Sequence, residues 1–140
     1  MPTVQPIILP DHILSAILTL AERQLLEKDS GKTRLAFRSH DFQLQEIFDQ
    51  LRKTGKYGIL DPFVFSDSGP EPYSPTLNES VSRLQLSGLI GRENPDYEVV
   101  FLRPAGRRFF DEVLAAEFDE AQHRQLAEIA SKFLERVSIV

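Results

Sequence analysis

The sequence predicts a mainly helical α+β domain in which a small β-hairpin interrupts a series of amphipathic helices. Three observations lead to this prediction. Apolar residues recur at helical spacing in several separate segments. Two short apolar runs, residues 89–90 and 97–102, flank the turn sequence Arg-Glu-Asn-Pro-Asp. A chain of 140 residues with 41% hydrophobic side chains is large enough for one domain with its own core.

The N-terminal part predicts an extended arm followed by a helix. Residues 1–10 contain three prolines and form the arm. Asp11 belongs to the residue types that cap helices. Apolar residues then repeat at helical spacing to about residue 27, namely Ile13, Leu14, Ile17, Leu18, Ala21 and Leu25. After a break at residues 28–33, a short strand is expected in the sequence Thr-Arg-Leu-Ala-Phe.

A second helix is expected from Ser39 or His40 to Gly55, which can end a helix. Its apolar residues fall at positions i, i+3, i+4 and i+7, and these are Leu44, Ile47, Phe48 and Leu51. The following segment, residues 62–66, has the sequence Pro-Phe-Val-Phe-Ser. Aromatic and β-branched residues fit a pleated surface, so this segment predicts a short strand.

The third helix carries the clearest boundary signals in the chain. Ser74 can cap its start, and Pro75 fits the first helical position, where the missing N–H costs nothing. Gly88 ends the helix. The buried stripe consists of Leu77, Val81 and Leu84. The β-hairpin follows directly.

Two further helices complete the predicted domain of residues 11–140. The first starts at Pro104, with Phe109, Phe110, Val113 and Leu114 on its inner side. The last runs over residues 120–137. Its apolar stripe contains Leu126, Ile129, Ala130, Phe133, Leu134 and Val137.

This order of elements, and two segments in particular, resemble winged-helix proteins. The segments are YSPTLNESVSRLQLSGLI, residues 73–90, and YEVVFLRPAGRRFFDEV, residues 97–113. They look like the recognition helix and hairpin of MarR-like and PadR-like regulators, whose hairpin returns into a Leu-Thr-x-x-Gly helix start. Here that start is Leu102-Arg103-Pro104-Ala105-Gly106, with Arg103 in place of the usual threonine.

A second resemblance is to an uncharacterised bacterial winged-helix family with a Tyr-Gly-Pro-Tyr-Ser-Pro signature, here the looser Gly-Pro-Glu-Pro-Tyr-Ser-Pro of residues 69–75. The resemblance covers residues 40–115. It implies a winged helix-turn-helix with additional helices at residues 11–27 and 120–137, in which the hairpin is the wing. It also implies a homodimeric transcriptional regulator that binds double-stranded DNA.

The third helix would then contact DNA through its outward face. At 100° per residue this face carries Asn78, Glu79, Ser82, Arg83 and Leu86. Asn and Arg present the donors and acceptors that read base edges. We therefore expect base contacts from Asn78, Ser82 and Arg83. The expected phosphate contacts are Lys53, Lys56, Arg92, Arg103, Arg107 and Arg108.

The charge of the chain supports an alternative, a winged-helix protein-interaction module such as an antitoxin-like inhibitor or an assembly subunit. The net charge is −5, whereas DNA-binding domains usually carry a positive excess. Residues 31–56 have six cations and three acids, and residues 111–140 have three cations and seven acids. Glu79 would repel phosphates. The residues expected at a protein or dimer interface are Leu86, Leu126, Ile129, Phe133 and Val137.

The chemical motifs in the chain predict neither an enzyme nor a metal or cofactor site. The chain has no cysteine. Adjacent residues such as Ser39-His40-Asp41 cannot supply the converging geometry of a catalytic triad. Gly31-Lys32-Thr33 lacks the first glycine of a phosphate-binding loop. No basic leader or apolar stretch of bilayer-spanning length is present, so a cytoplasmic protein is expected.

Overall fold

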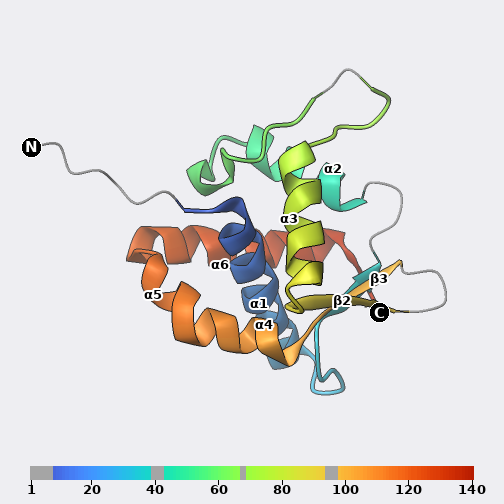
Figure 1. The fold of residues 1–140 in the computed structure, drawn as a ribbon, viewed down its shortest axis with the longest axis vertical. Helices are drawn as coiled ribbons and strands as arrows, with labels where there is room; N and C mark the ends of the chain where they lie inside the picture. Colours follow the sequence, from blue (N-terminus) through green and yellow to red (C-terminus); the bar gives the residue numbers. More distant parts are fainter. Residues whose placement is uncertain (1–7, 39–42, 67–68, 94–97) are drawn as a thin grey trace, which may run out of the picture.

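The computed structural model describes residues 8–38, 43–66, 69–93 and 98–140. In these residues the chain forms α1 (Pro10–Lys28), β1 (Ala36–Arg38), α2 (Gln43–Lys53), the 3₁₀ turn η1 (Gly58–Leu60), α3 (Pro75–Leu86), β2 (Ile90–Glu93), β3 (Val99–Leu102), α4 (Pro104–Phe109), the π-helical turn η2 (Phe110–Leu114), α5 (Ala115–Glu117), α6 (Glu120–Arg136) and β4 (Ser138–Ile139). The predicted mainly helical α+β class is confirmed (Figure 1).

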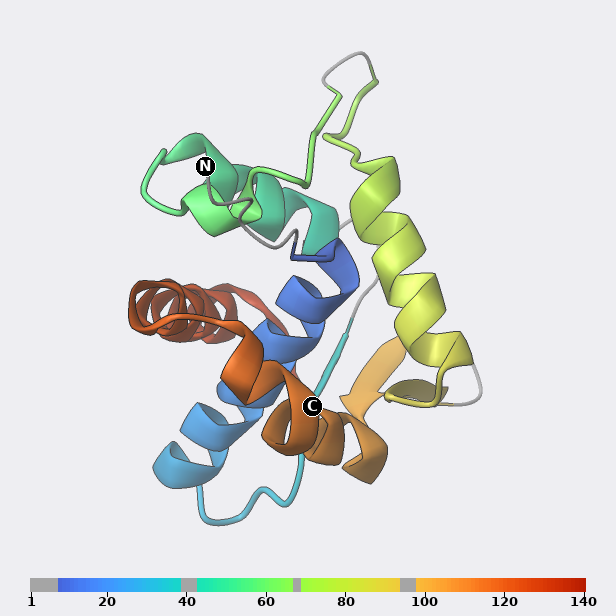
Figure 2. The ribbon, with the colours of Figure 1, turned by 60° about the vertical axis from the view of Figure 1, so that its left-hand side comes forward.

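Helix α1 forms the centre of the molecule. It lies between α6 on one side and α3 on the other (Figure 2). The apolar side chains predicted from helical spacing are buried, among them Leu14, Ile17 and Ala21. Buried polar residues such as Ser15 and Thr19 lie in the same turns, and the Thr19 hydroxyl donates to the Ser15 carbonyl. Helix α1 is therefore enclosed on most of its circumference.

The strands form one antiparallel sheet in the order β2-β3-β1-β4. Strand β1 is central, because Phe37 is opposite Val100 of β3 and opposite Ile139 of β4. The Phe37 ring packs edge-on against Phe133 of α6, with ring centroids 5.1 Å apart. The predicted hairpin is confirmed as β2 and β3, with Ile90 opposite Leu102. Part of its turn, residues 94–97, lies outside the described residues.

The helix ends predicted from glycine and serine are confirmed. Gly55 follows α2 with φ of 73°, and Gly88 follows α3 with φ of 77°. Residues with a Cβ atom rarely adopt this left-handed conformation, so glycine at these positions favours a helix end. At the start of α3, the Ser74 hydroxyl accepts a hydrogen bond from the Leu77 N–H.

Two expectations near the ends of elements are wrong. Asp11 does not cap α1, because Pro10 lets the helix begin one residue earlier and Leu9 is at the cap position. The segment 62–66 does not form a strand, and it contributes only an isolated bridge between Ser66 and Tyr73. Instead Phe63 is buried and packs edge-on against Phe48 of α2. Burial in the core, rather than strand pairing, therefore explains the apolar residue Phe63, whereas Val64 is 60% exposed.

Two other differences concern α2 and the C-terminal residues. The start of α2 predicted near Ser39 or His40 lies outside the described residues, and the described part of the helix begins at Gln43. The C-terminal residues form β4, which the sequence pattern did not predict. Two residues are too few for a recognisable alternation, and the pairing with β1 is visible only in three dimensions.

Candidate interaction surface on α3

The start of α3 is fixed to α2 by a buried side chain. The Gln45 amide accepts a hydrogen bond from the Ser74 N–H at 2.7 Å and donates one to the Ser74 carbonyl at 3.1 Å. Both residues are buried. Because each polar group of this contact has a partner, it holds the first turn of α3 at a defined position on α2.

The outward face of α3 is the one predicted from the sequence. Leu77, Ser80, Val81 and Leu84 are buried, whereas Asn78, Glu79, Ser82, Gln85 and Leu86 are exposed. Leu86 is 87% exposed, the largest value among the large hydrophobic side chains described as exposed. A leucine so far out of the core gains nothing from folding of this chain, and burial by a partner would stabilise a complex.

Arg83, an expected base contact, is held against α1. Its Nε and Nη2 atoms donate to the two carboxylate oxygens of Asp11 at 2.7 and 2.9 Å. Glu79 lies one turn earlier, with a carboxylate oxygen 3.7 Å from Nη1 of Arg83. The hydrogen bond with Asp11 raises the pKa of Arg83. The structure thus surrounds this one cation with two acids.

Arg107, an expected phosphate contact, has an internal partner. Its guanidinium donates to Glu22 of α1, with Nη2 and Oε2 3.0 Å apart and a second hydrogen bond from Nε. Glu22 is 2% exposed and also accepts the Leu35 N–H at 2.8 Å. The hydrogen bond with Glu22 raises the pKa of Arg107. Arg107 therefore neutralises a buried carboxylate and is unsuited to a phosphate contact, which corrects the prediction from sequence.

The other expected phosphate contacts divide into two groups. Lys53 pairs with Asp49 at 3.0 Å, and the Nε of Arg92 donates to Gln85 at 3.1 Å. Lys56, Arg103 and Arg108 are exposed, and within the described part of the chain their side chains have no hydrogen-bond or ion-pair partner. Lys56 follows α2, which is beside the N-terminal half of α3, while the other two belong to the start of α4 near the opposite end (Figure 1).

Four of the five residues expected at a protein interface are inside the chain. Leu126, Ile129 and Phe133 of α6 are fully buried, and Val137 is 8% exposed. Their stripe faces α1 and the sheet, so it is covered without a second copy. This corrects the interface prediction for these four residues. A wide apolar stripe shows only that a helix is packed, and the packing here is intramolecular.

The histidines of the described residues have structural contacts. His12 Nδ1 is 2.8 Å from Glu117 Oε2, and His123 Nε2 is 2.8 Å from the Ala115 carbonyl. Among the residues that can be described, no group of three or more His, Asp or Glu side chains could hold a metal ion. The segment Ser39-His40-Asp41 lies outside them. No helix in the same set of residues has the length and apolarity to cross a bilayer.

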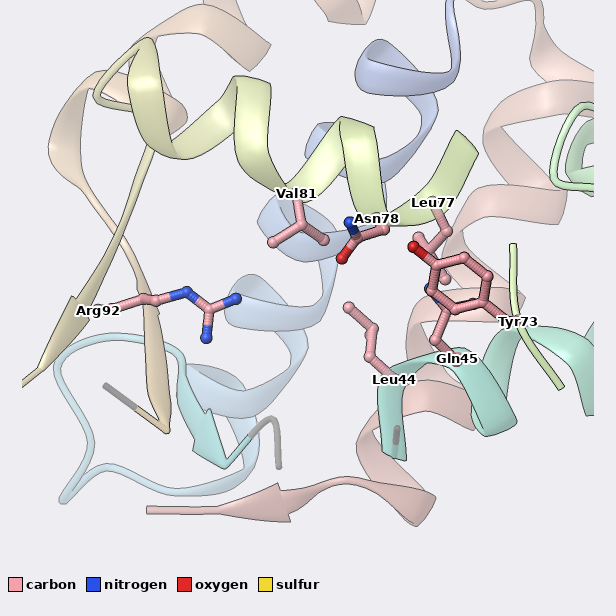
Figure 3. Close-up of a pocket in the computed structure, with 7 residues that line it drawn as sticks. All are labelled: Leu44, Gln45, Tyr73, Leu77, Asn78, Val81 and Arg92. Carbon is pink, nitrogen blue, oxygen red and sulfur yellow. The ribbon is translucent and has the colours of Figure 1, made fainter. Parts of the chain in front are cut away.

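A pocket between α2, α3 and β2 was not predicted from the sequence. It is lined by Leu44, Gln45, Tyr73, Leu77, Asn78, Val81 and Arg92 and encloses about 140 Å³ (Figure 3). The apolar patterns of α2 and α3 predicted each helix separately. Nothing in the sequence indicated that Tyr73 and Arg92 would line the same pocket as Leu44, because that depends on how the hairpin returns to the helices.

The comparisons with known proteins give no match: no family model, no curated protein and no solved structure matches this chain.

Proposed function

We propose that this chain is a winged-helix protein in which α3 has the position of the recognition helix and the β2–β3 hairpin is the wing. The order α1, β1, α2, α3, β2, β3 supports this proposal. So does the strand order, in which β1 joins the returning strand β3 rather than β2. One departure is the long connection between α2 and α3, where many helix-turn-helix proteins have a turn of about 3–4 residues.

We further propose that α3 contacts another protein, so that the chain acts as an interaction module. The observation that carries this proposal is the exposure of Leu86, 87% on the outward face of α3. The charges near Leu86 also favour a protein partner over DNA. Asp11 and Glu79 outnumber Arg83, so a duplex approaching this face would meet a carboxylate excess. Burying one leucine on a partner contributes about 2 kcal/mol.

The test is affinity capture from extracts of the source cells, followed by binding measurements with the purified partner. We expect Leu86→Arg to weaken partner binding at least about tenfold, because a buried unpaired cation replaces an apolar contact. Val113→Arg is the matched control, since Val113 is 45% exposed and lies outside α3. Equal binding by wild type and Leu86→Arg would contradict the proposal.

A second candidate is the homodimeric DNA-binding regulator expected from the sequence. It is favoured by Lys56, Arg103 and Arg108, whose side chains have no partner among the described residues, and by the exposure of Asn78 and Ser82. Cations without internal partners can contact phosphates without first breaking an ion pair. A dimer of this kind would have to use surface other than the buried stripe of α6.

Titration of a labelled mixed-sequence duplex at low and moderate salt tests this candidate. The informative variant is Arg103→Ala with Arg108→Ala, because neither side chain has a structural partner in the described residues. The DNA-binding candidate predicts that binding weakens steeply with salt and that this variant lowers the logarithmic salt slope by about 2. Absence of duplex binding at low salt would exclude it.

A further inference from the structure

Helix α3 depends on one residue for positive charge. Among the residues Pro75–Leu86, Arg83 is the only cation and Glu79 is the only acid. The other exposed polar side chains of the helix are neutral, and they are Asn78, Ser82 and Gln85. Contacts between cations and phosphates supply much of the affinity of a protein for nucleic acid. Binding of a nucleic acid along α3 would therefore need Arg83.

The guanidinium of Arg83 is engaged by carboxylates on all sides. Its Nε and Nη2 atoms donate to the two carboxylate oxygens of Asp11 at 2.7 and 2.9 Å. Its Nη1 atom is 3.7 Å from a carboxylate oxygen of Glu79. A bidentate pair between arginine and a carboxylate is a strong and directional contact. A phosphate would have to compete with Asp11 for the same donors, and it would approach two carboxylates in doing so.

Helix capping does not explain the position of the Asp11 carboxylate. Leu9 is at the cap position of α1, and no side chain caps this end of the helix. The first turn of α1 lies beside α3, and both oxygens of Asp11 accept from Arg83 there (Figure 2). Asp119, by contrast, caps α6 by accepting the Gln122 N–H. A favourable interaction of Asp11 with the dipole of α1 needs no partner on α3.

Cations near the hairpin differ from Arg83 in their surroundings. Within the described residues, the side chains of Arg103 and Arg108 at the start of α4 have no hydrogen-bond or ion-pair partner. The cation on α3 has two acids. A general tendency of surface charges to pair would not produce this difference, so the pairing of Arg83 is specific to α3.

We propose that Asp11 is a specificity-determining residue that excludes nucleic acid from the outward face of α3. It occupies the guanidinium of Arg83, and Glu79 adds a second carboxylate where phosphates would approach. This inference rests on the proposed interaction function, because it reserves α3 for a protein partner. A purely structural role of the pair would change the stability of the fold and would leave the affinity for DNA as it is.

The test is titration of a labelled mixed-sequence duplex with the full chain carrying Asp11→Asn and Glu79→Gln, at low and at moderate salt. These substitutions remove two negative charges and keep the shapes of the side chains. We expect the variant to bind the duplex at least about tenfold more tightly than wild type at low salt, because Arg83 becomes available to a phosphate. The logarithmic salt slope should steepen by about 1, which corresponds to one further phosphate contact.

Two further variants control this measurement. Glu27→Gln with Asp61→Asn changes the net charge by the same amount at exposed acids outside α3, and its affinity should stay within about twofold of wild type. Adding Arg83→Gln to the test variant should remove the gain in affinity. Thermal melts establish that each variant is folded. Asp11→Ser with Glu79→Gln replaces the test variant if asparagine at position 11 does not support the fold.

Three results would overturn the inference. The first is a test variant that binds the duplex no more tightly than the charge-matched control. The second is a wild-type chain that binds the duplex as tightly as the test variant, since Asp11 would then exclude nothing. The third is a gain in affinity that persists after Arg83→Gln, because the released guanidinium would then not be the contact.

Failure of this inference and failure of the proposed function give different results. If Leu86→Arg loses the protein partner while the test variant gains no affinity for the duplex, α3 is a protein interface and Asp11 does not determine its specificity. If Leu86→Arg keeps the partner while the test variant gains affinity for the duplex, Asp11 excludes nucleic acid but the partner binds elsewhere.

Discussion

At the scale of single residues, Gly106 shows how close packing determines a residue type. A Cβ atom at this position would lie 2.6 Å from the Leu89 carbonyl oxygen and 2.7 Å from Leu102 Cδ1. The Leu89 carbonyl accepts the Arg103 N–H at 3.0 Å, so it cannot move away freely. The glycine in the helix start Leu-Arg-Pro-Ala-Gly is thus required because α4 packs tightly against the residue that leads into β2.

We therefore expect Gly106→Ala to destabilise the chain by about 1–3 kcal/mol. In an exposed helix the same substitution would stabilise it by about 1 kcal/mol. The measurement is urea unfolding followed by circular dichroism. Gly58→Ala is the control, because a Cβ atom at Gly58 would have nothing within 4 Å. Unchanged stability of Gly106→Ala would show that α4 can shift away from Leu89.

Substitutions of the neighbours Arg107 and Arg108 are predicted to change stability differently, although the sequence pattern predicted phosphate contacts for both. Arg107→Ala leaves the buried Glu22 carboxylate without its cation, which costs about 3–5 kcal/mol. Arg108→Ala removes an exposed side chain and changes stability by less than about 0.5 kcal/mol. Thermal unfolding of the two variants measures the difference. Similar melting temperatures would mean that Glu22 finds another partner.

The ion pair of Asp11 with Arg83 gives a predicted pH dependence. Burial raises the pKa of Asp11, but hydrogen bonds and attraction from Arg83 outweigh this effect, so the pKa is lower than usual. A lowered pKa in the folded state means that the carboxylate stabilises the fold above its ordinary pKa of about 4. This contribution is lost as the pH falls through the folded pKa.

We expect Asp11→Asn to melt below wild type at neutral pH and to approach it in acid. Thermal melts between about pH 7 and pH 3 measure this convergence. Asp61→Asn is a matched control, since Asp61 is exposed and its carboxylate has no partner in the described part of the chain. A constant difference between Asp11→Asn and wild type at all pH values would contradict the role of the carboxylate charge.

At the scale of elements, local signals predicted the helices and the β2–β3 hairpin well, but they failed for the segment 62–66 and for strand β4. Helix α3 has Ser74, Pro75 and Gly88 at its boundaries, and each acts within one turn of the helix. The segment at 62–66 and strand β4 lack such local determinants. Phe63 is apolar because it packs on Phe48, and Ile139 is apolar because it pairs beside Phe37. Both depend on residues far away in the sequence.

The residues of the candidate site also divide into those that local patterns predicted and those that depend on the fold. Helical geometry alone placed Asn78, Ser82 and Leu86 on the outward face of α3, where the structure has them. Exposure is a local property of an amphipathic helix. The partners of Arg83 and Arg107 lie on α1, more than seventy residues away in the sequence. Which cations remain available to a ligand could therefore be decided only from the fold.

Strand β4 is predicted to contribute to the stability of the fold. It pairs with β1, and the Val140 N–H donates to the Ala36 carbonyl at 3.0 Å. A chain ending at Val137 would lose these hydrogen bonds and expose the edge of β1. We expect a loss of about 1–3 kcal/mol and faster amide hydrogen exchange in residues 36–38. Ser138→Ala, which keeps the backbone, is the control, and unchanged exchange in the truncated chain would contradict the pairing.

At the scale of the whole molecule, internal contacts occupy several cations and the apolar stripe that the sequence assigned to partners. The net charge of −5 already opposed a strongly cationic surface, and Arg83 and Arg107 are committed to carboxylates on α1. The apolar stripe of α6 is likewise buried in the core. The face of α3 and its flanking pocket, by contrast, combine the exposed Leu86 with defined polar groups such as Asn78 and Gln45.

The burial of α6 within a single chain predicts how the free energy of unfolding depends on protein concentration. Ile129 is fully buried within one chain, so Ile129→Ala should destabilise the fold by about 2–5 kcal/mol. Because the cavity lies inside a single chain, this loss should be the same at low and at high protein concentration. An interface through α6 would instead make the loss depend on concentration, since dimerisation stabilises folded chains by mass action. Urea unfolding of wild type and variant over a hundredfold range of concentration, about 0.5 to 50 μM, distinguishes these outcomes. Val113→Ala, at an exposed apolar residue, is the control that should leave the midpoint nearly unchanged.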